Sequence, residues 1–112
     1  MKKIEAIIRE ERLDSVRKAI EAESYFGMTV SEVSGRGKEG ALSLQWRAGD
    51  YKVEFLPKIK VEIVVLDEDL SRVVHAIMTS ARTGEKGDGK IFVMDVLNAI
   101  RIRTGDSGGD AV

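Results

Sequence analysis

A glycine- and lysine-rich segment over residues 83–93 has the residue types best suited to holding a phosphate. It reads TGEKGDGKIFV, with three glycines and two lysines. Glycines allow tight turns that bring backbone N–H groups close to a ligand, and successive N–H groups form an anion-binding hollow. A neighbouring lysine adds a point charge suited to phosphate. The pattern predicts a phosphate-binding loop, although a solvated turn between a helix and a strand has the same composition.

This segment is not a P-loop, despite a partial match. Residues 84–90 fit the G-x-x-x-x-G-K part of that motif. The motif continues with Ser or Thr, which reaches magnesium, and it opens a helix. Here Ile91 follows, and residues 91–94 are apolar and strand-like. The sequence therefore argues against a P-loop ATPase.

Two arginines near the end of the chain form a second candidate anion site. Arg101 and Arg103 alternate with isoleucines over residues 100–103. In a strand, residues two apart point to the same face. Paired guanidinium groups on one face form a plausible anion clamp, and the alternative is a solvated sheet face.

Hydrophobic periodicity predicts the elements that must position these groups. Alternating apolar residues indicate strands, and apolar residues three or four apart indicate helices. The predicted strands cover residues 3–8, 28–34, 59–66, 91–96 and, briefly, 100–103; the predicted helices cover residues 12–22 and 67–81. The single proline, Pro57, stands just before the third strand, which is a permitted place.

The order β-α-β-β-α-β indicates an α+β, ferredoxin-like fold, with an antiparallel sheet and two helices on one face. The length of 112 residues suggests one domain over residues 1–112. A long polar loop over residues 37–55 joins the second and third strands, and such loops are usually functional or disordered. The tail over residues 105–112 is polar and shows no packing pattern.

Composition excludes several classes of protein. The net charge is −1, so no global field attracts nucleic acid or a membrane. The absence of cysteine excludes disulfides and thiolate metal sites. The N-terminus lacks the long apolar run of a signal peptide or membrane span, so we expect a cytoplasmic protein.

Other residues that could carry chemistry also have a simpler structural interpretation. His75, the only histidine, has no partner cluster in the sequence and is expected to be a partly exposed helix residue. The acidic run over residues 67–69 fits a helix N-terminus rather than a metal site. Trp46 is either a docking residue or packs on its own loop.

Two other functions are compatible with this fold and composition. One is a small nucleotide-hydrolysing enzyme on a ferredoxin-like fold, although no clear nucleophile–base pair is visible. The other is RNA binding, for which the aromatic motif of RNA-recognition domains is missing.

Eight sequence blocks, in order and across nearly the whole chain, resemble the PII signal-transduction (nitrogen regulatory) proteins. The blocks are GMTV at 27–30, EV at 32–33, GRG at 35–37, FLPK at 55–58, KVEIVV at 60–65, ARTG at 81–84, GDGKIFV at 87–93 and IRIRTG at 100–105. Their shared order and spacing are far more specific than one glycine loop.

The resemblance implies a homotrimer that binds ATP or ADP competitively in the clefts between subunits. Many members also bind 2-oxoglutarate together with ATP and magnesium. The long loop then docks on, or leaves, a target such as an ammonium channel, glutamine synthetase or another nitrogen-metabolism enzyme or regulator. The implied role is sensing rather than catalysis, in the cytoplasm, with recruitment to a membrane only through a transporter.

The resemblance also implies roles for individual residues. Those implied to hold the phosphates are Gly87, Asp88, Gly89 and Lys90, with Arg101 and Arg103 reaching in from the adjacent subunit. Those implied to line the base and sugar are Ile7, Thr29, Glu62 and Val64, and Gly37 and Lys38 complete the nucleotide site. Lys58 is implied to pair with 2-oxoglutarate. Tyr51 stands where some bacterial members are uridylylated, and an exposed, unmodified loop tyrosine is the alternative.

Two positions depart from the family pattern. Glu39 replaces the glutamine that binds magnesium in the family, and Lys38 replaces an arginine. A carboxylate can bind magnesium. It also places a negative charge beside a dicarboxylate and a triphosphate, which at ~4 Å costs about 4 kcal/mol with an effective dielectric constant near 20. We therefore expect adenine nucleotides to bind and 2-oxoglutarate to bind weakly or not at all.

Overall fold

The computed structural model describes residues 1–37 and 55–112. Lys38, Glu39, Trp46 and Tyr51 lie outside the described residues, so the predictions made for them stay predictions. The two ends of the undescribed segment lie close together. Gly35 pairs with Leu56 across neighbouring strands, and the Arg36 guanidinium lies 5.6 Å from the centre of the Phe55 ring.

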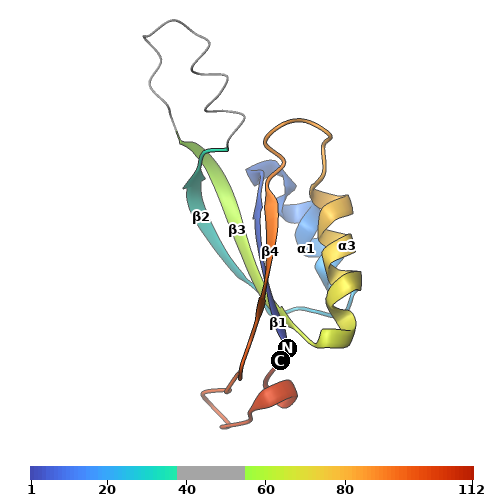
Figure 1. The fold of residues 1–112 in the computed structure, drawn as a ribbon, viewed down its shortest axis with the longest axis vertical. Helices are drawn as coiled ribbons and strands as arrows, with labels where there is room; N and C mark the ends of the chain where they lie inside the picture. Colours follow the sequence, from blue (N-terminus) through green and yellow to red (C-terminus); the bar gives the residue numbers. More distant parts are fainter. Residues whose placement is uncertain (38–54) are drawn as a thin grey trace, which may run out of the picture.

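A four-stranded antiparallel sheet carries two helices on one face (Figure 1). The elements are β1 (Lys2–Ile8), α1 (Leu13–Ala22), β2 (Thr29–Gly35), β3 (Leu56–Val65), α3 (Leu70–Ala81) and β4 (Lys90–Asp95). Short 3-10 helices cover Glu10–Arg12, Asp67–Asp69 and Gly108–Ala111. The strand order is β2-β3-β1-β4. The predicted α+β, ferredoxin-like βαββαβ fold is confirmed.

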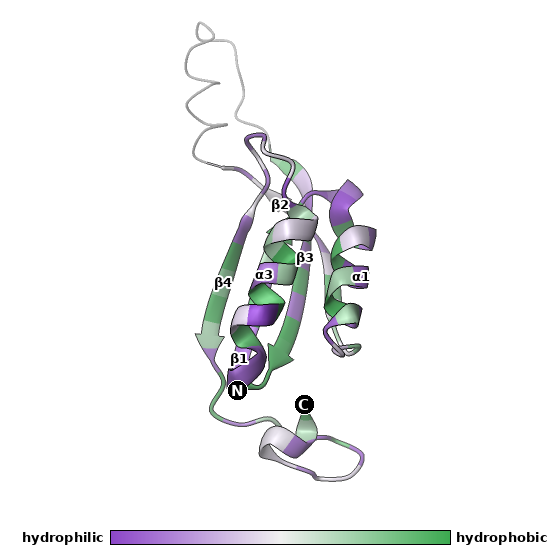
Figure 2. Ribbon diagram, turned by 90° about the vertical axis from the view of Figure 1, so that its right-hand side faces the viewer, coloured by the Kyte–Doolittle hydropathy of each residue, from purple (hydrophilic) through white to green (hydrophobic). Residues whose placement is uncertain are grey.

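The core lies between the sheet and the helices (Figure 2). The side chains of β1 and β3 alternate between the two faces, so every second residue reaches the helices. The buried residues are Ile4, Ala6 and Ile8 of β1, Ile59, Val61, Ile63 and Val65 of β3, Val16 and Ile20 of α1, and Val73, Ile77 and Ala81 of α3. The two helices place residues three or four apart on the same buried stripe.

The opposite face of the sheet has no covering layer within the described residues, and it carries a ladder of charges. The Lys60 ammonium lies 3.3 Å from the carboxylates of both Glu5 and Glu62, and the Lys3 ammonium lies 3.2 Å from Glu62. Within the described chain, β2 and β4 are the edge strands. The outer strand β4 exposes Phe92, and this face therefore mixes apolar and charged side chains.

The prediction for Pro57 was wrong in one detail, because Pro57 lies inside β3 rather than before it. It pairs with Ser34 of β2. The register of β3 with β1 ends at Ile59, so the proline stands at a part of the strand that has a neighbour on one side only. Proline is tolerated there because its missing N–H is not needed by a second neighbour.

The predicted short strand over residues 100–103 was also wrong. Only Ile100 makes a bridge, with Ser107, and the chain turns back after it. Backbone N–H groups close this turn, from Arg101 to Asp106 O at 2.8 Å and from Gly105 to Arg101 O at 2.8 Å. A strand needs a neighbouring strand, and this segment runs past the end of the sheet (Figure 1). Arg101 and Arg103 therefore do not share one strand face in the single chain, as the predicted anion clamp required.

The C-terminal tail is more structured than its composition predicts. Gly108–Ala111 forms a 3-10 helix, and Gly108 N–H donates to Ala99 O at 3.0 Å. Gly109 faces Leu66, and a side-chain carbon added at Gly109 would lie 3.5 Å from Leu66 Cδ2. The tail thus folds back beside the end of β3.

Candidate functional site

The glycine loop between α3 and β4 adopts a backbone that only glycine accepts easily. Gly84, Gly87 and Gly89 have φ values of 88°, 93° and 102°. Gly89 is also the most crowded position, because an added Cβ would lie 1.7 Å from the carbonyl oxygen of Ile7. The loop can therefore approach β1 only with glycine at this position.

Asp88 ties the loop together from inside. Its carboxylate accepts hydrogen bonds from Thr83 N and Gly84 N at 2.9 Å each and from Arg9 Nε at 3.0 Å, and it also bonds the Thr83 hydroxyl. The hydrogen bond from the Thr83 hydroxyl, with the others, holds the pKa of Asp88 well below its usual range. Asp88 is thus a structural brace, and its acceptor oxygens are turned to the loop itself.

Two cations fix the direction of the loop's peptide groups. Arg9 Nη2 donates to Lys86 O at 2.6 Å, and Lys58 Nζ donates to Gly87 O at 2.6 Å. A trans peptide places its C=O and N–H on opposite sides. The N–H groups of Gly87 and Asp88 therefore point away from these cations, which is the orientation that an anion-binding loop requires.

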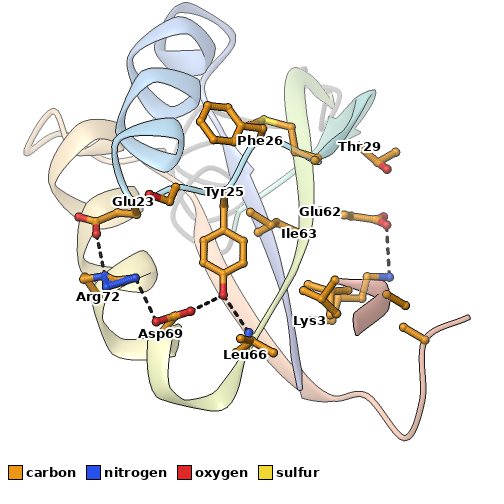
Figure 3. Close-up of a pocket in the computed structure, with 17 residues that line it drawn as sticks. Lys3, Glu23, Tyr25, Phe26, Thr29, Glu62, Ile63, Leu66, Asp69 and Arg72 are labelled. Carbon is orange, nitrogen blue, oxygen red and sulfur yellow. Dashed lines mark hydrogen bonds and ion pairs between the residues drawn. The ribbon is translucent and has the colours of Figure 1, made fainter. Parts of the chain in front are cut away.

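A cavity of about 940 Å³ lies at the other end of the sheet (Figure 3). Its walls are the α1–β2 connection, the end of β3, the start of the second helical segment and the C-terminal residues Ala111 and Val112. Three of the four residues implied to contact a base and sugar lie in these walls, namely Thr29, Glu62 and Val64.

The strand register explains why these residues gather. Thr29 is directly opposite Glu62 across β2 and β3. Ile7, the fourth implied residue, is opposite Lys60 on one side and Lys90 on the other. Ile7, Lys90, Thr29 and Glu62 therefore share the face of the sheet that the helices leave uncovered.

The structure does not bring Arg101 and Arg103 to this site within one chain. Both are exposed on the segment beyond β4, at the opposite end of the sheet from the glycine loop (Figure 1). Arg101 Nη2 contacts Asp110 O at 3.4 Å. Gly37, also implied, is exposed at the start of the undescribed segment.

Sequence reasoning assigned no role to three residues that shape the site. Arg9 and Thr83 brace the glycine loop, and Tyr25 anchors the cavity wall. Arg9 and Asp88 are 79 positions apart, so no local pattern could have paired them. The only signal was the position of Arg9 directly after a strand.

Comparison with known proteins decides the family. A family model described as "Nitrogen regulatory protein P-II" matches residues 1–106. The chain belongs to the P-II family. The P-II resemblance predicted from the eight sequence blocks is confirmed.

Relatives of this P-II chain span its full length. It is 54% identical over 112 residues to "Nitrogen regulatory protein P-II 1" of Methanothermobacter thermautotrophicus, covering 100% of this chain and 97% of that protein. It is 51% identical to "Nitrogen regulatory protein P-II" of Pasteurella multocida, covering 100% of both. A crystal structure of Arabidopsis thaliana PII bound to citrate matches with a TM-score of 0.82 and 40% identity, over 99% of this chain and 91% of that one.

These P-II relatives are named as regulatory proteins, which agrees with a signalling role. In residues 1–37 and 55–112 of the P-II chain, no group of three or more His, Cys, Asp or Glu side chains is placed to hold a metal ion. Within the same residues, no helix is long and apolar enough to span a membrane.

Proposed function

We propose that this P-II protein is a cytoplasmic sensor of adenine nucleotides that binds ATP or ADP and controls nitrogen-related target proteins. The glycine loop is the observation that carries this proposal. Its carbonyl groups are held by Arg9 and Lys58, its N–H groups point outward, and Lys90 follows directly in β4. This is the arrangement expected of a phosphate site.

The position of the cavity favours a nucleotide over an isolated phosphate as the ligand. Lys58, which touches the loop, and Glu62, which lines the cavity, are both on the uncovered face of β3. Four residues along a strand span about 13 Å. This separation suits a ligand with phosphates at one end and a base at the other.

Calorimetry tests this function directly. ATP and ADP with magnesium should bind the purified protein, and Lys90→Ala should weaken ATP binding by about tenfold, which is the loss of one charge-assisted contact. Lys18→Ala removes an exposed lysine from α1, away from the loop, and serves as the control. Absence of ATP and ADP binding to the unchanged protein would overturn the proposal.

The site is proposed to lie between subunits of a homotrimer. Within the described residues of one chain, the phosphate loop has no contact with Arg101 or Arg103, so a second copy must supply them if they take part. Leu97 and Ile102 are fully exposed, and Ile100 is 67% exposed. We call the segment that carries Leu97, Ile100 and Ile102 the arm after β4. Its exposed apolar side chains are suited to pack on a neighbouring copy.

The loop over residues 37–55 is proposed to dock on the target, with an ammonium channel or a nitrogen-metabolism enzyme as the target class. The test is the binding of a purified ammonium channel in ATP and then in ADP. Retention in only one nucleotide supports the switch, and equal retention in both contradicts it.

Weak binding of 2-oxoglutarate is proposed from Glu39, which adds negative charge where the family has glutamine. Calorimetry with ATP and magnesium should show at most weak 2-oxoglutarate binding, and Glu39→Gln should strengthen it. Micromolar affinity in the unchanged protein would refute this part of the proposal. Hydrolysis of ATP, if present, should stay slower than about 1 per second, which separates a sensor from an ordinary enzyme.

A further inference from the structure

We infer that the Tyr25 hydroxyl is a positioning group that holds the base-facing wall of the nucleotide cavity in place. This inference rests on the proposed function, since it concerns the same site. It adds residues that the phosphate loop and the base-lining residues do not include. Its basis is a connected polar network in the lining of the cavity (Figure 3).

The wall begins at the end of α1 with a strained turn. Ser24 has φ of 67°, in the left-handed region. Its N–H donates to Glu21 O at 2.9 Å, and Tyr25 N–H donates to Ile20 O at 3.3 Å. These two bonds form a Schellman motif, in which glycine usually occupies the left-handed position. The turn directs the chain away from α1 and into the cavity wall.

Tyr25 fixes the direction in which the chain leaves this turn. Its hydroxyl accepts a hydrogen bond from Leu66 N at 3.1 Å and donates one to the Asp69 carboxylate. Its ring packs against the hydrophobic core. Burial, followed by the hydrogen bond to Asp69, raises the pKa of Tyr25, which keeps the hydroxyl protonated as a donor.

Arg72 extends the network to the end of α1. Its guanidinium lies 3.0 Å from Asp69 and 2.7 Å from Glu23. Tyr25, Asp69, Arg72 and Glu23 therefore link the two helical segments across the back of the cavity. All four also line the cavity, so a change in the network reaches its surface directly.

The consequence concerns the segment that follows. Residues 26–29 lead from Tyr25 to Thr29, and all four of them line the cavity. Thr29 is the first residue of β2 and pairs with Glu62. With Tyr25 anchored on one side and the β2–β3 ladder on the other, this short segment has little freedom. Without the Tyr25 hydroxyl, the segment over residues 26–29 would keep only the β2–β3 pairing as an anchor.

The test compares nucleotide affinity in Tyr25→Phe with that in Arg17→Gln. Arg17 makes an ion-pair cluster on α1 with Asp14 at 2.7 Å and Glu21 at 3.1 Å, and it does not line the cavity. Tyr25→Phe should weaken ATP and ADP binding by the same factor, about tenfold, because the base wall changes and the phosphate loop does not. Arg17→Gln should leave the affinities for ATP and ADP within about twofold of those of the unchanged protein, even if it lowers the melting temperature as much as Tyr25→Phe does.

Two further variants keep the inference falsifiable if Tyr25→Phe folds poorly. Asp69→Ala removes the acceptor of the hydroxyl and should reproduce the loss of affinity, whereas Asp69→Asn keeps an acceptor oxygen and should restore most of it. The inference is overturned if the removal variants bind ATP as the unchanged protein does, if ATP and ADP are affected differently, or if Arg17→Gln shows the same loss. If the unchanged protein binds neither nucleotide, the proposed function itself is refuted and this inference is refuted with it.

Discussion

At the scale of single residues, Gly89 is the position most tightly constrained by the structure. Any side chain there meets the Ile7 carbonyl oxygen and must also adopt a positive φ. Gly89→Ala should lower the free energy of unfolding by about 3 kcal/mol through backbone strain and displacement of the loop. Urea unfolding measures this loss.

Gly27 provides the control for that substitution. Its φ is not in the left-handed region, and an added Cβ meets nothing within 4 Å. Gly27→Ala should change the free energy of unfolding by no more than about 0.5 kcal/mol. Equal effects at the two positions would show that the close approach to Ile7 does not exist in solution.

The stability of the fold should depend on pH through the Asp88 carboxylate. The folded state holds its pKa below the unfolded value of about 3.9. Its contribution to stability is therefore complete above about pH 4 and is lost as the pH falls further, when protonation removes the acceptor. The stability difference between the unchanged protein and Asp88→Asn should shrink from pH 7 to pH 2.5.

Urea unfolding at several pH values measures this difference. Asp106→Asn, at an exposed carboxylate of the tail, is the control for the loss of a surface carboxylate. A constant difference between Asp88→Asn and the unchanged protein across the acid range would show that the carboxylate does not brace the loop.

At the scale of elements, the end of α1 contains stored strain. Ser24 occupies the left-handed position at a cost of about 1 kcal/mol relative to glycine. Ser24→Gly should therefore raise the free energy of unfolding by up to about 1 kcal/mol, measured as a higher midpoint in denaturant. Ser24→Ala keeps the side-chain carbon and should give no such gain, so equal gains would contradict the strain.

The elements also show what local sequence can and cannot predict. The strands β1 and β3 and both helices were predictable because alternation and helical spacing directly reflect which residues face the core. The stretch around Arg101 alternates equally well, yet alternation does not say whether a partner strand is present. Arg9 and Tyr25 were missed because their partners lie far along the chain and depend on the folded topology.

At the scale of the whole molecule, the exposed arm after β4 should control assembly. Ile102→Ser should raise the concentration at which the proposed trimer dissociates by about 100-fold, since burying such a side chain contributes roughly 2 to 3 kcal/mol. Sedimentation against the 12.4 kDa mass of one chain measures the state of assembly.

Met78→Ser on α3 is the matched control, because Met78 is also an exposed apolar residue and lies on the helical face. It should leave the assembly unchanged. Assembly of Ile102→Ser as tightly as the unchanged protein would remove the arm from the interface.

The outer edge of β4 has a consequence for how newly made chains must behave. Its Phe92, Val93 and Met94 form a short apolar run whose outer backbone groups have no strand partner within residues 1–37 and 55–112, with Lys90 at one end and Asp95 at the other. Such an edge can nucleate fibres when chains meet in the wrong register. Rapid assembly of newly made chains would then protect them from aggregation. Until the chains assemble, the charges of Lys90 and Asp95 oppose pairing of the exposed edges.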